Sequence, residues 1–248
     1  MDTYGLMGKK LGHSFSKAYF ERKFKELGIN SQYLNFELDD IRHLKNMLND
    51  HPGLKGLNVT IPYKKDVLNF IDSMDPVAAK VGSVNTLKII RTDDKISIRG
   101  YNTDVIGFEE TLKPLVAGRK DIAALILGTG GASNAVAFVL QKLHIPYTYV
   151  SRVPKNKEQF SYKDLTEKIL HKYQLIINTT PVGMFPVVSE VPPIPYQYLN
   201  AKHILYDLIY NPEETKFLKF GREKACQTIN GLKMLELQAE ASWRIWNS

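Results

Sequence analysis

Cysteine is almost absent from this sequence, because Cys226 is the single cysteine among 248 residues. One thiol excludes an internal disulfide framework and is typical of a protein in a reducing compartment. No apolar run approaches the roughly 18 residues that a membrane-spanning helix needs. The first ten residues, MDTYGLMGKK, also do not have the basic start and apolar middle of a signal peptide. We therefore expect a cytoplasmic protein that does not bind a membrane.

Long runs of basic residues are missing too, although 33 Lys and Arg against 26 Asp and Glu give a net charge of +7. Nucleic-acid-binding modules gather basic and aromatic side chains on one face, whereas the basic residues here occur singly or in pairs. An anionic small ligand and a basic-biased surface explain the charge equally well. The six histidines show no ligand spacing such as H-E-x-x-H. We expect neither a nucleic-acid partner nor a bound metal.

The sequence does contain a regular alternation of strand-like and helix-like segments. In the first hundred residues the expected strands are 3–8, 31–38, 54–60, 83–90 and 95–102, and the expected helices are 16–28, 39–50 and one starting at Pro62. Further along, the expected strands are 121–128, 146–152, 175–180 and 203–210, with helices at 104–115 and 231–246. The turn residues TDD predict a hairpin before 95–102. This alternation predicts an α/β fold with mainly parallel strands and helices on the sheet faces.

Lys64 raises a question within this pattern. Residues 56–65 read GLNVTIPYKK, in which Thr60 suits a helix N-cap and Pro62 suits the first helical turn. Lys64 would then lie in that first turn, where the helix dipole disfavours a cation. Its side chain is either an exposed amine that reaches water or a functional group.

A glycine-rich turn follows the expected strand 121–128 and opens a helix of small residues. Gly128 permits a tight turn, and Gly130 lets the backbone approach a pyrophosphate that the N–H groups of the helix can hold. Ser133 takes the third glycine position of G-x-G-x-x-G. Because the turn joins a strand to a helix and another strand is expected at 146–152, this segment predicts a dinucleotide site.

The end of the strand 146–152 predicts which dinucleotide binds. NAD-binding proteins place an acidic residue there to hold the ribose 2′-hydroxyl, but this sequence reads YVSRVPKNK, without a carboxylate before Glu158. Ser151 and Arg152 stand at the strand end, and a guanidinium can hold a 2′-phosphate through paired hydrogen bonds. NADP(H) is therefore the expected cofactor, and a solvated basic loop is the alternative.

Eight short motifs follow one another along the whole chain. They are GHSFS (12–16), NVTIPYKK (58–65), SVNT (83–86), GYNTDVIG (100–107), GTGGA (128–132), NTTPVGM (178–184), YDLIYNP (206–212) and GLKMLELQ (231–238). Together they resemble the shikimate dehydrogenase family, which reduces 3-dehydroshikimate with NADPH. The resemblance implies two domains. A mainly parallel-sheet substrate domain would comprise 1–101 and the returning C-terminal helix in 231–248, and a Rossmann-type NADP-binding domain would comprise 102–230.

The resemblance also implies roles for individual residues. Lys64, paired with Asp104, would be catalytic. The implied substrate-binding residues are Ser14, Ser16, Asn58, Thr60, Asn85, Tyr210 and Gln238. The implied cofactor-binding residues are Gly128, Thr129, Gly130, Gly131, Ala132, Ser151, Arg152, Thr180, Leu208 and Gly231. Taken singly, many of these residues have ordinary alternatives, such as a serine that caps a helix.

The implied reaction is the reversible, NADPH-dependent reduction of 3-dehydroshikimate to shikimate in aromatic amino-acid (chorismate) biosynthesis. Lys64 would give a proton to the carbonyl oxygen, and the Asp104 carboxylate would stabilise the charged amine. A quinate or dual quinate/shikimate dehydrogenase and a non-catalytic NADP-binding paralogue are the alternatives. A monomer and a homodimer both remain open.

Overall fold

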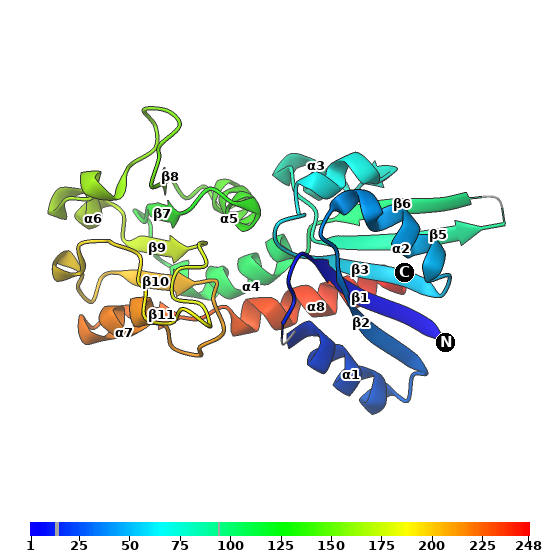
Figure 1. The fold of residues 1–248 in the computed structure, drawn as a ribbon. Coiled ribbons are helices and arrows are strands. Elements are labelled where there is room, and N and C mark those ends of the chain that lie inside the picture. The colour runs from blue at the N-terminus through cyan, green and yellow to red at the C-terminus, as the bar shows by residue number, and fades with distance from the viewer. Residues whose placement is uncertain (13–14, 94) are drawn as a thin grey trace. The chain divides into compact units, whose positions relative to one another are not determined.

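The structure, a computed structural model, describes residues 1–12, 15–93 and 95–248. These residues form two compact units, one of Met1–Thr103 with Gln238–Ser248 and one of Asp104–Leu237. Each unit has its own sheet flanked by helices, so the expected α/β class is confirmed (Figure 1). The expected substrate and cofactor domains are assignments of function, and they stay predictions at this stage.

The first unit is built on a six-stranded sheet ordered β2-β1-β3-β5-β6-β4. Its strands are β1 (Asp2–Gly8), β2 (Ser31–Glu37), β3 (Leu54–Val59), β4 (Ser73–Met74), β5 (Thr86–Thr92) and β6 (Lys95–Tyr101). β1 is parallel to β2 and β3, whereas β5 is antiparallel to both β3 and β6. The β5–β6 pairing confirms the predicted hairpin.

Helices cover both faces of this sheet. Successive side chains of a strand point to opposite sides, so a strand with apolar residues in both directions needs a helix on each face. The helical elements are α1 (Phe15–Leu27), η1 (Ile41–His43), α2 (Leu44–Asp50), η2 (Asp66–Phe70), α3 (Pro76–Val81) and the end of α8 (Leu232–Trp246). On one face, Tyr33 of β2 packs with Phe20 of α1 and Trp246 of α8. On the other, Leu57 of β3 and Leu44 of α2 belong to one apolar cluster. Figure 1 shows α1 and α2 on these opposite faces.

The α-helix expected from Pro62 does not form, so this prediction is wrong. Residues 61–65 form a turn, and the helical segment after them is the 3₁₀ helix η2. The Tyr63 N–H donates to the Thr60 carbonyl over 3.0 Å, and the Ile61–Pro62 peptide bond is cis. Val67 and Phe70 pack in the same apolar cluster and are three residues apart, which is the spacing at which side chains share a face of a 3₁₀ helix. Lys64 therefore lies in a turn.

The second unit has a parallel five-stranded sheet ordered β11-β10-β9-β7-β8. Its strands are β7 (Ala124–Leu127), β8 (Tyr147–Val150), β9 (Leu175–Asn178), β10 (Ile204–Asp207) and β11 (Gln227–Ile229). Its helical elements are α4 (Asp104–Val116), α5 (Gly131–Lys142), η3 (Tyr162–Asp164), α6 (Glu167–Lys172), η4 (Tyr196–Tyr198), α7 (Lys216–Glu223) and the start of α8. The side chains of β7 and β9 are buried along their whole length, as expected for central parallel strands covered on both faces.

The helices carry no membrane signature. Among the described residues, no helix is both long enough and apolar enough to cross a bilayer.

Candidate active site

A buried network of polar side chains lies between the sheet of the first unit and the end of α8. The Asn58 amide on β3 donates to the Ser242 hydroxyl on α8 over 2.8 Å. The Ser242 hydroxyl also lies 2.8 Å from the Thr86 hydroxyl at the start of β5, which is 3.1 Å from the hydroxyl of Thr103. All four side chains are buried. Burying so many polar groups is tolerated because each has a hydrogen-bond partner.

Two further predicted substrate residues belong to the same network. The Asn85 side-chain oxygen accepts from the Thr103 N–H over 2.7 Å, and its amide donates to the Thr103 hydroxyl over 3.0 Å. The Thr103 hydroxyl also donates to the side-chain oxygen of Gln238 over 3.4 Å. The network therefore brings together Asn58, Asn85 and Gln238, which are far apart in sequence. Sequence analysis assigned no role to Thr86, although it ends the SVNT motif, or to Ser242, although it stands four residues after Gln238 and so on the same helix face.

Ser16 joins the network through a tyrosine. It lies buried in the first turn of α1 and is hydrogen-bonded to the hydroxyl of Tyr33, whose own proton goes to the Asn58 oxygen over 2.8 Å. Burial raises the pKa of the Tyr33 hydroxyl well above its usual range, and the bond to Ser16 lowers it only in part. Tyr33 therefore stays protonated and acts as a fixed donor. The other predicted serine, Ser14, lies outside the described residues.

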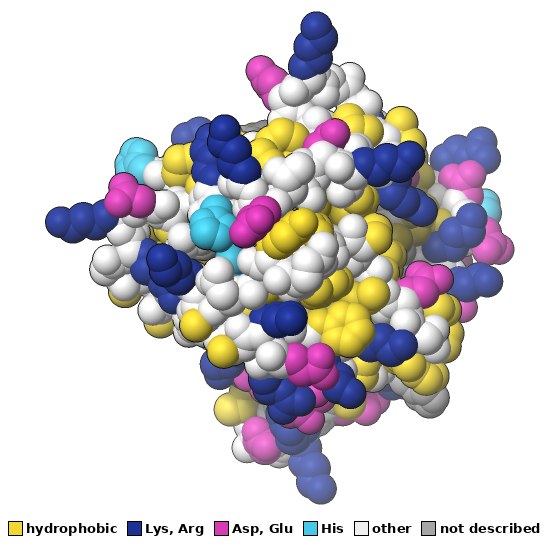
Figure 2. Space-filling view, turned by 90° about the vertical axis from the view of Figure 1, so that its left-hand side faces the viewer, with side chains coloured by type: hydrophobic (Ala, Val, Ile, Leu, Met, Phe, Trp, Pro, Cys, Tyr) yellow, Lys and Arg dark blue, Asp and Glu magenta, His cyan; other side chains and the backbone are white. Residues whose placement is uncertain are grey.

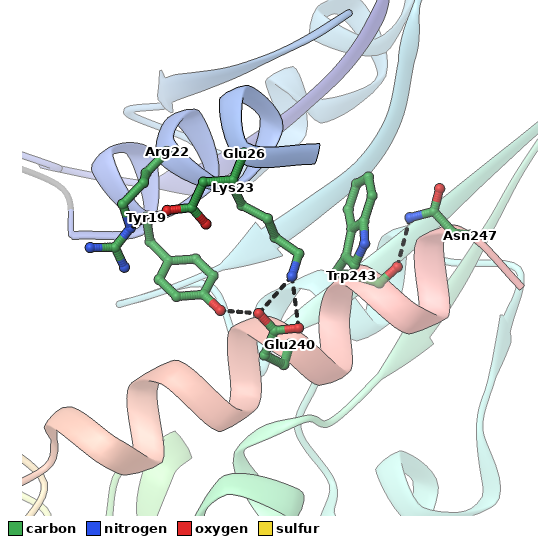
Figure 3. Close-up of polar contacts among 7 residues, drawn as sticks. All are labelled: Tyr19, Arg22, Lys23, Glu26, Glu240, Trp243 and Asn247. Carbon is green, nitrogen blue, oxygen red and sulfur yellow. Dashed lines mark hydrogen bonds and ion pairs between the residues drawn. The ribbon is translucent and has the colours of Figure 1, made fainter. Parts of the chain in front are cut away.

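An ion pair fixes α1 against α8 beside this network (Figure 3). The Lys23 amine contacts both Glu240 carboxylate oxygens, at 2.7 and 2.9 Å, and the Tyr19 hydroxyl donates to the same carboxylate. Burial alone would raise the pKa of Glu240, but the hydrogen bonds from Lys23 and Tyr19 outweigh it and lower the pKa. Because α1 carries Ser16 and α8 carries Gln238, this contact holds two predicted substrate residues in a fixed relation.

Thr60 directly follows β3, and Lys64 lies in the turn after it. The Thr60 N–H donates to the Met7 carbonyl over 2.9 Å, and the Lys64 carbonyl accepts from the Val84 N–H over 2.8 Å. The Lys64 side chain is half-buried, and the next residue, Lys65, is exposed. Val84 directly precedes Asn85, so the backbone of Lys64 is anchored one residue from the polar network. The turn thus gives Lys64 a defined place even though no α-helix starts there.

The predicted partner of Lys64 belongs to the other unit. Asp104 is the first residue of α4, is buried, and directly follows Thr103 of the network. Tyr210 also lies in the second unit, half-buried after β10, where burial raises the pKa of its hydroxyl. The pairing of Lys64 with Asp104 and the contribution of Tyr210 to the substrate site stay predictions.

The predicted cofactor residues of the second unit gather at one edge of its sheet. Gly128 follows β7, Ser151 follows β8, Thr180 comes two residues after β9, Leu208 follows β10, and Gly231 comes two residues after β11. All five strands are parallel, so their carboxyl ends share one edge. Ligands of open α/β sheets bind at this edge. The fold therefore supplies a common place for residues spread over a hundred positions of sequence.

The backbone of the glycine-rich turn is accessible to a ligand at this edge of the sheet. Gly128 has φ +102°, and a Cβ there would come within 2.8 Å of Thr180 Cγ2. Thr129 follows, and Gly130 is the N-cap of α5, whose first turn contains Gly131 and Ala132. A Cβ on Gly130 would meet nothing within 4 Å. Open space at a helix N-terminus suits the pyrophosphate of a dinucleotide, so these residues fit the expected cofactor.

The loop after β8 carries the residues expected at the 2′-phosphate. The Ser151 hydroxyl donates to the Val153 carbonyl over 3.0 Å, which closes a tight turn, and Arg152 is exposed within it. The positive charge of Arg152 lowers the pKa of the nearby Tyr162 hydroxyl, although burial raises that pKa by more. Arg152 is therefore an exposed cation just after the end of β8, where it can meet an anion.

Leu208 and Gly231 touch each other at the same edge. A Cβ added to Gly231 would lie 2.1 Å from the Leu208 carbonyl oxygen, so only glycine fits without a shift of the backbone. The Gly231 N–H donates to the Ile209 carbonyl over 3.0 Å. The segment 208–209 and the start of α8 are therefore held together as one surface.

Metal-ligating clusters and surface charge are two further signs of a functional site. Among the described residues, no group of three or more His, Cys, Asp or Glu side chains could hold a metal ion. On the face drawn in Figure 2, Lys and Arg side chains are interspersed with acidic and apolar ones.

The matching family model and the similar curated proteins name the same family. The family model described as "Shikimate dehydrogenase substrate binding domain" matches residues 6–87. A curated "Shikimate dehydrogenase (NADP(+))" of Methanococcus aeolicus is 36% identical over 258 residues, covering 98% of this chain and 90% of that protein.

Solved structures extend the similarity to the whole fold. A chorismate mutase/shikimate 5-dehydrogenase fusion protein from Clostridium acetobutylicum is 39% identical, with a TM-score of 0.86 over 100% of this chain and 91% of that chain. Shikimate 5-dehydrogenase from Thermus thermophilus, solved in complex with NADP(H) and shikimate, is 28% identical, with a TM-score of 0.84 over 99% of this chain and 93% of that chain.

Proposed function

The chain belongs to the shikimate dehydrogenase family, and on that premise we propose that it reduces 3-dehydroshikimate reversibly to shikimate, with Lys64 and Asp104 as the catalytic pair. It is an NADP-dependent oxidoreductase. The observation that carries the proposal is the buried network that joins Asn58, Asn85 and Gln238. A polyhydroxylated acid needs several directional polar partners, and this network holds amide groups in fixed orientations for it.

The substrate carboxylate is assigned to the start of α1. Ser16 lies in the first turn of that helix, where hydroxyl groups and the helix dipole both favour an anion, and Ser14 precedes it in sequence. Thr60 and Asn85 are assigned to the ring hydroxyls, together with Asp104. Tyr210 is also assigned to the substrate.

Lys64 is assigned the proton. Its backbone is anchored to Val84 and its side chain is half-buried, so the amine has a limited range in which to meet the substrate oxygen. It gives a proton to the carbonyl oxygen during reduction and accepts the hydroxyl proton in the reverse direction. Asp104 stabilises the charged amine and holds it in position. Its place directly after Thr103 supports this role, because Thr103 is bonded to Asn85.

NADPH supplies the hydride when it is bound. Gly130 and the N-terminus of α5 would hold the pyrophosphate, and Ser151 and Arg152 would hold the 2′-phosphate. Thr180, Leu208 and Gly231 form the surface for the nicotinamide end. The chorismate pathway is the metabolic setting that this reaction implies.

A substrate panel tests the reaction. Shikimate and quinate are each assayed with NADP and NAD, and shikimate with NADP is expected to give the highest kcat/KM. A higher kcat/KM for quinate would identify a quinate or dual enzyme instead. NADP binding without turnover of either acid would identify a non-catalytic paralogue.

Lys64→Ala tests the catalytic assignment, and Lys65→Ala is the matched control because Lys65 is the exposed neighbour in the same turn. Loss of a positioned acid/base is expected to lower kcat by about 10²–10⁴ with little change in the shikimate KM, whereas the control keeps the parent kcat. Asp104→Asn is expected to lower kcat and alter the pH–rate profile. A Lys64→Ala kcat within a few-fold of the parent would overturn the assignment.

A further inference from the structure

Asp207 is a fully buried carboxylate at the carboxyl end of β10 that none of the roles above uses. One of its oxygens accepts from the Asn178 amide over 3.0 Å and from the Ile209 N–H over 3.1 Å. The other accepts from the Thr215 hydroxyl over 2.6 Å. All three partners are neutral donors, which matches an ionised carboxylate that can only accept. Asp207 therefore joins three separate segments at the edge where the cofactor residues gather.

The Asn178 bond leads to Thr180. The Asn178 side-chain oxygen accepts from the Thr180 hydroxyl over 2.6 Å and from its N–H over 3.1 Å. An amide has distinct donor and acceptor ends, so the bond from Asn178 to Asp207 fixes which end faces Thr180. Without Asp207, the amide keeps only the Val182 carbonyl as an acceptor, at 3.5 Å against 3.0 Å to Asp207, and the orientation of the group that holds Thr180 is weakened.

The Ile209 bond leads to Leu208 and Gly231. Leu208 lies between Asp207 and Ile209, and its N–H donates to the Asn178 carbonyl over 3.0 Å. The Ile209 carbonyl in turn accepts from the Gly231 N–H over 3.0 Å. Asp207 thus fixes the backbone that carries Leu208 and meets Gly231.

The hydrogen bond from Thr215 links Asp207 to the start of α7. Thr215 is the N-cap of α7, and its hydroxyl accepts from the Leu218 N–H over 3.4 Å. This branch stabilises a helix end and reaches none of the predicted cofactor residues. One oxygen of Asp207 is therefore linked to the predicted cofactor residues, and the other is linked only to the start of α7. A variant of Thr215 consequently serves as a matched control.

We propose that Asp207 is a positioning residue for the nicotinamide end of NADP(H), acting through Asn178 and Ile209 on Thr180, Leu208 and Gly231. It does not contact the cofactor itself. The inference rests on the proposed function for the identity of the ligand. It goes beyond that function because it assigns cofactor affinity to a buried residue outside the binding surface.

The test compares Asp207→Ala, Asp207→Asn and Thr215→Val in the full chain. Asp207→Ala is expected to raise the NADP(H) KM more than tenfold and the shikimate KM less than twofold. Asp207→Asn keeps an acceptor oxygen for Asn178 and Ile209 and is expected to stay within threefold of the parent for both. Thr215→Val removes only the branch to α7, so it is expected to lower the melting temperature and leave both KM values unchanged.

A second variant covers the case in which Asp207→Ala does not fold. Asn178→Ala leaves Asp207 with two of its donors and breaks the link to Thr180, so it is expected to raise the NADP(H) KM while the chain stays folded. NADP⁺ binding by calorimetry checks both variants without turnover, so a parent that binds NADP⁺ but reduces no substrate refutes the proposed reaction and not this role. The role is overturned if the folded variants bind NADP⁺ within twofold of the parent, or if Thr215→Val weakens binding as much as they do.

Discussion

Ser242 is the residue whose removal most directly tests the polar network of the first unit. Its side chain is fully buried. The hydroxyl accepts from Asn58 over 2.8 Å, lies 2.8 Å from the Thr86 hydroxyl, and donates to the Gln238 carbonyl over 3.0 Å. Ser242→Ala removes all these bonds with the loss of one oxygen atom. The Asn58 amide then keeps only the Thr86 hydroxyl, at 3.4 Å.

The expected loss of stability follows from that one orphaned donor. A buried polar group left without its partner costs about 1–3 kcal/mol. We expect about 1–2 kcal/mol here, because Thr86 offers Asn58 a long substitute bond and Thr86 itself keeps a contact to Thr103. For a chain of this size that corresponds to a fall of roughly 2–8 °C in the melting temperature.

Binding is expected to weaken as well, because Ser242 orients the Asn58 amide, whereas its bond to Gln238 goes to the backbone carbonyl. The shikimate KM should rise by up to roughly tenfold, since about 1.4 kcal/mol of lost orientation corresponds to one factor of ten. The NADP(H) KM should not change, because its predicted residues lie in the other unit.

Ser248→Ala is the matched control for this experiment. Its hydroxyl also donates to a backbone carbonyl at the end of α8, that of Ile245 over 2.9 Å, but the residue is exposed. The control therefore loses a comparable local bond without touching the network. Thermal unfolding and steady-state kinetics are measured for both variants. Equal melting temperatures and equal shikimate KM values for Ser242→Ala and Ser248→Ala would refute the reasoning.

Two further predictions concern the second unit. Arg152→Ala is expected to raise the NADPH KM at least tenfold and the NADH KM less than twofold, because the proposed partner of the guanidinium is the 2′-phosphate, which NADH lacks; equal effects on the two cofactors in steady-state kinetics would contradict this. Burial raises the pKa of Asp207 to about 6, against the hydrogen bonds from Thr215, Ile209 and Asn178 that lower it. The folded state therefore holds the Asp207 proton more tightly than the unfolded state, and this stabilisation is lost as pH rises from about 4 to about 6. Over that window the parent should lose about 3 kcal/mol of unfolding free energy relative to Asp207→Asn. Burial, and to a smaller extent the charge of Asp207, raise the pKa of the neighbouring Tyr196 hydroxyl. Tyr196 therefore does not titrate in this pH range. Denaturation curves at four pH values check this, and parallel pH profiles for the two proteins would contradict it.

The elements predicted correctly from the sequence are those with a strong local signal. Short apolar segments bounded by polar or glycine residues predict the strands β1, β2, β3 and β7, and the glycine-rich turn predicts the start of α5. The short elements α6, α7 and β11 had no counterpart among the expected segments, because six to eight helical residues or three strand residues carry too little periodicity. After Pro62 the sequence predicts a helical segment, but it does not distinguish a 3₁₀ helix from an α-helix.

The candidate site divides in the same way. The motifs pointed to Asn58, Asn85 and Gln238, but they did not show that Thr86 and Ser242 hold these residues in place. Ser242 is far from Asn58 and Thr86 in sequence, so only tertiary structure brings these side chains within hydrogen-bond reach. Thr86 and Ser242 both left a signal: Ser242 is spaced four residues from Gln238, and Thr86 is the last residue of the SVNT motif, directly after Asn85.

The network also explains why the C-terminal helix must return to the first unit. Trp246 packs on β3 so closely that a Cβ on Gly56 would come within 2.4 Å of its indole, and its ring N–H donates to the Leu87 carbonyl over 3.0 Å. This anchor sets the position of α8 on the sheet, and Gln238 and Ser242 lie on the same helix two turns and one turn earlier. The apolar end of α8 therefore fixes the register of its polar part. A substitution at Trp246 should consequently act on substrate binding through Ser242 and Gln238, although the indole itself lies among Tyr4, Phe20 and Tyr33 in the aromatic cluster.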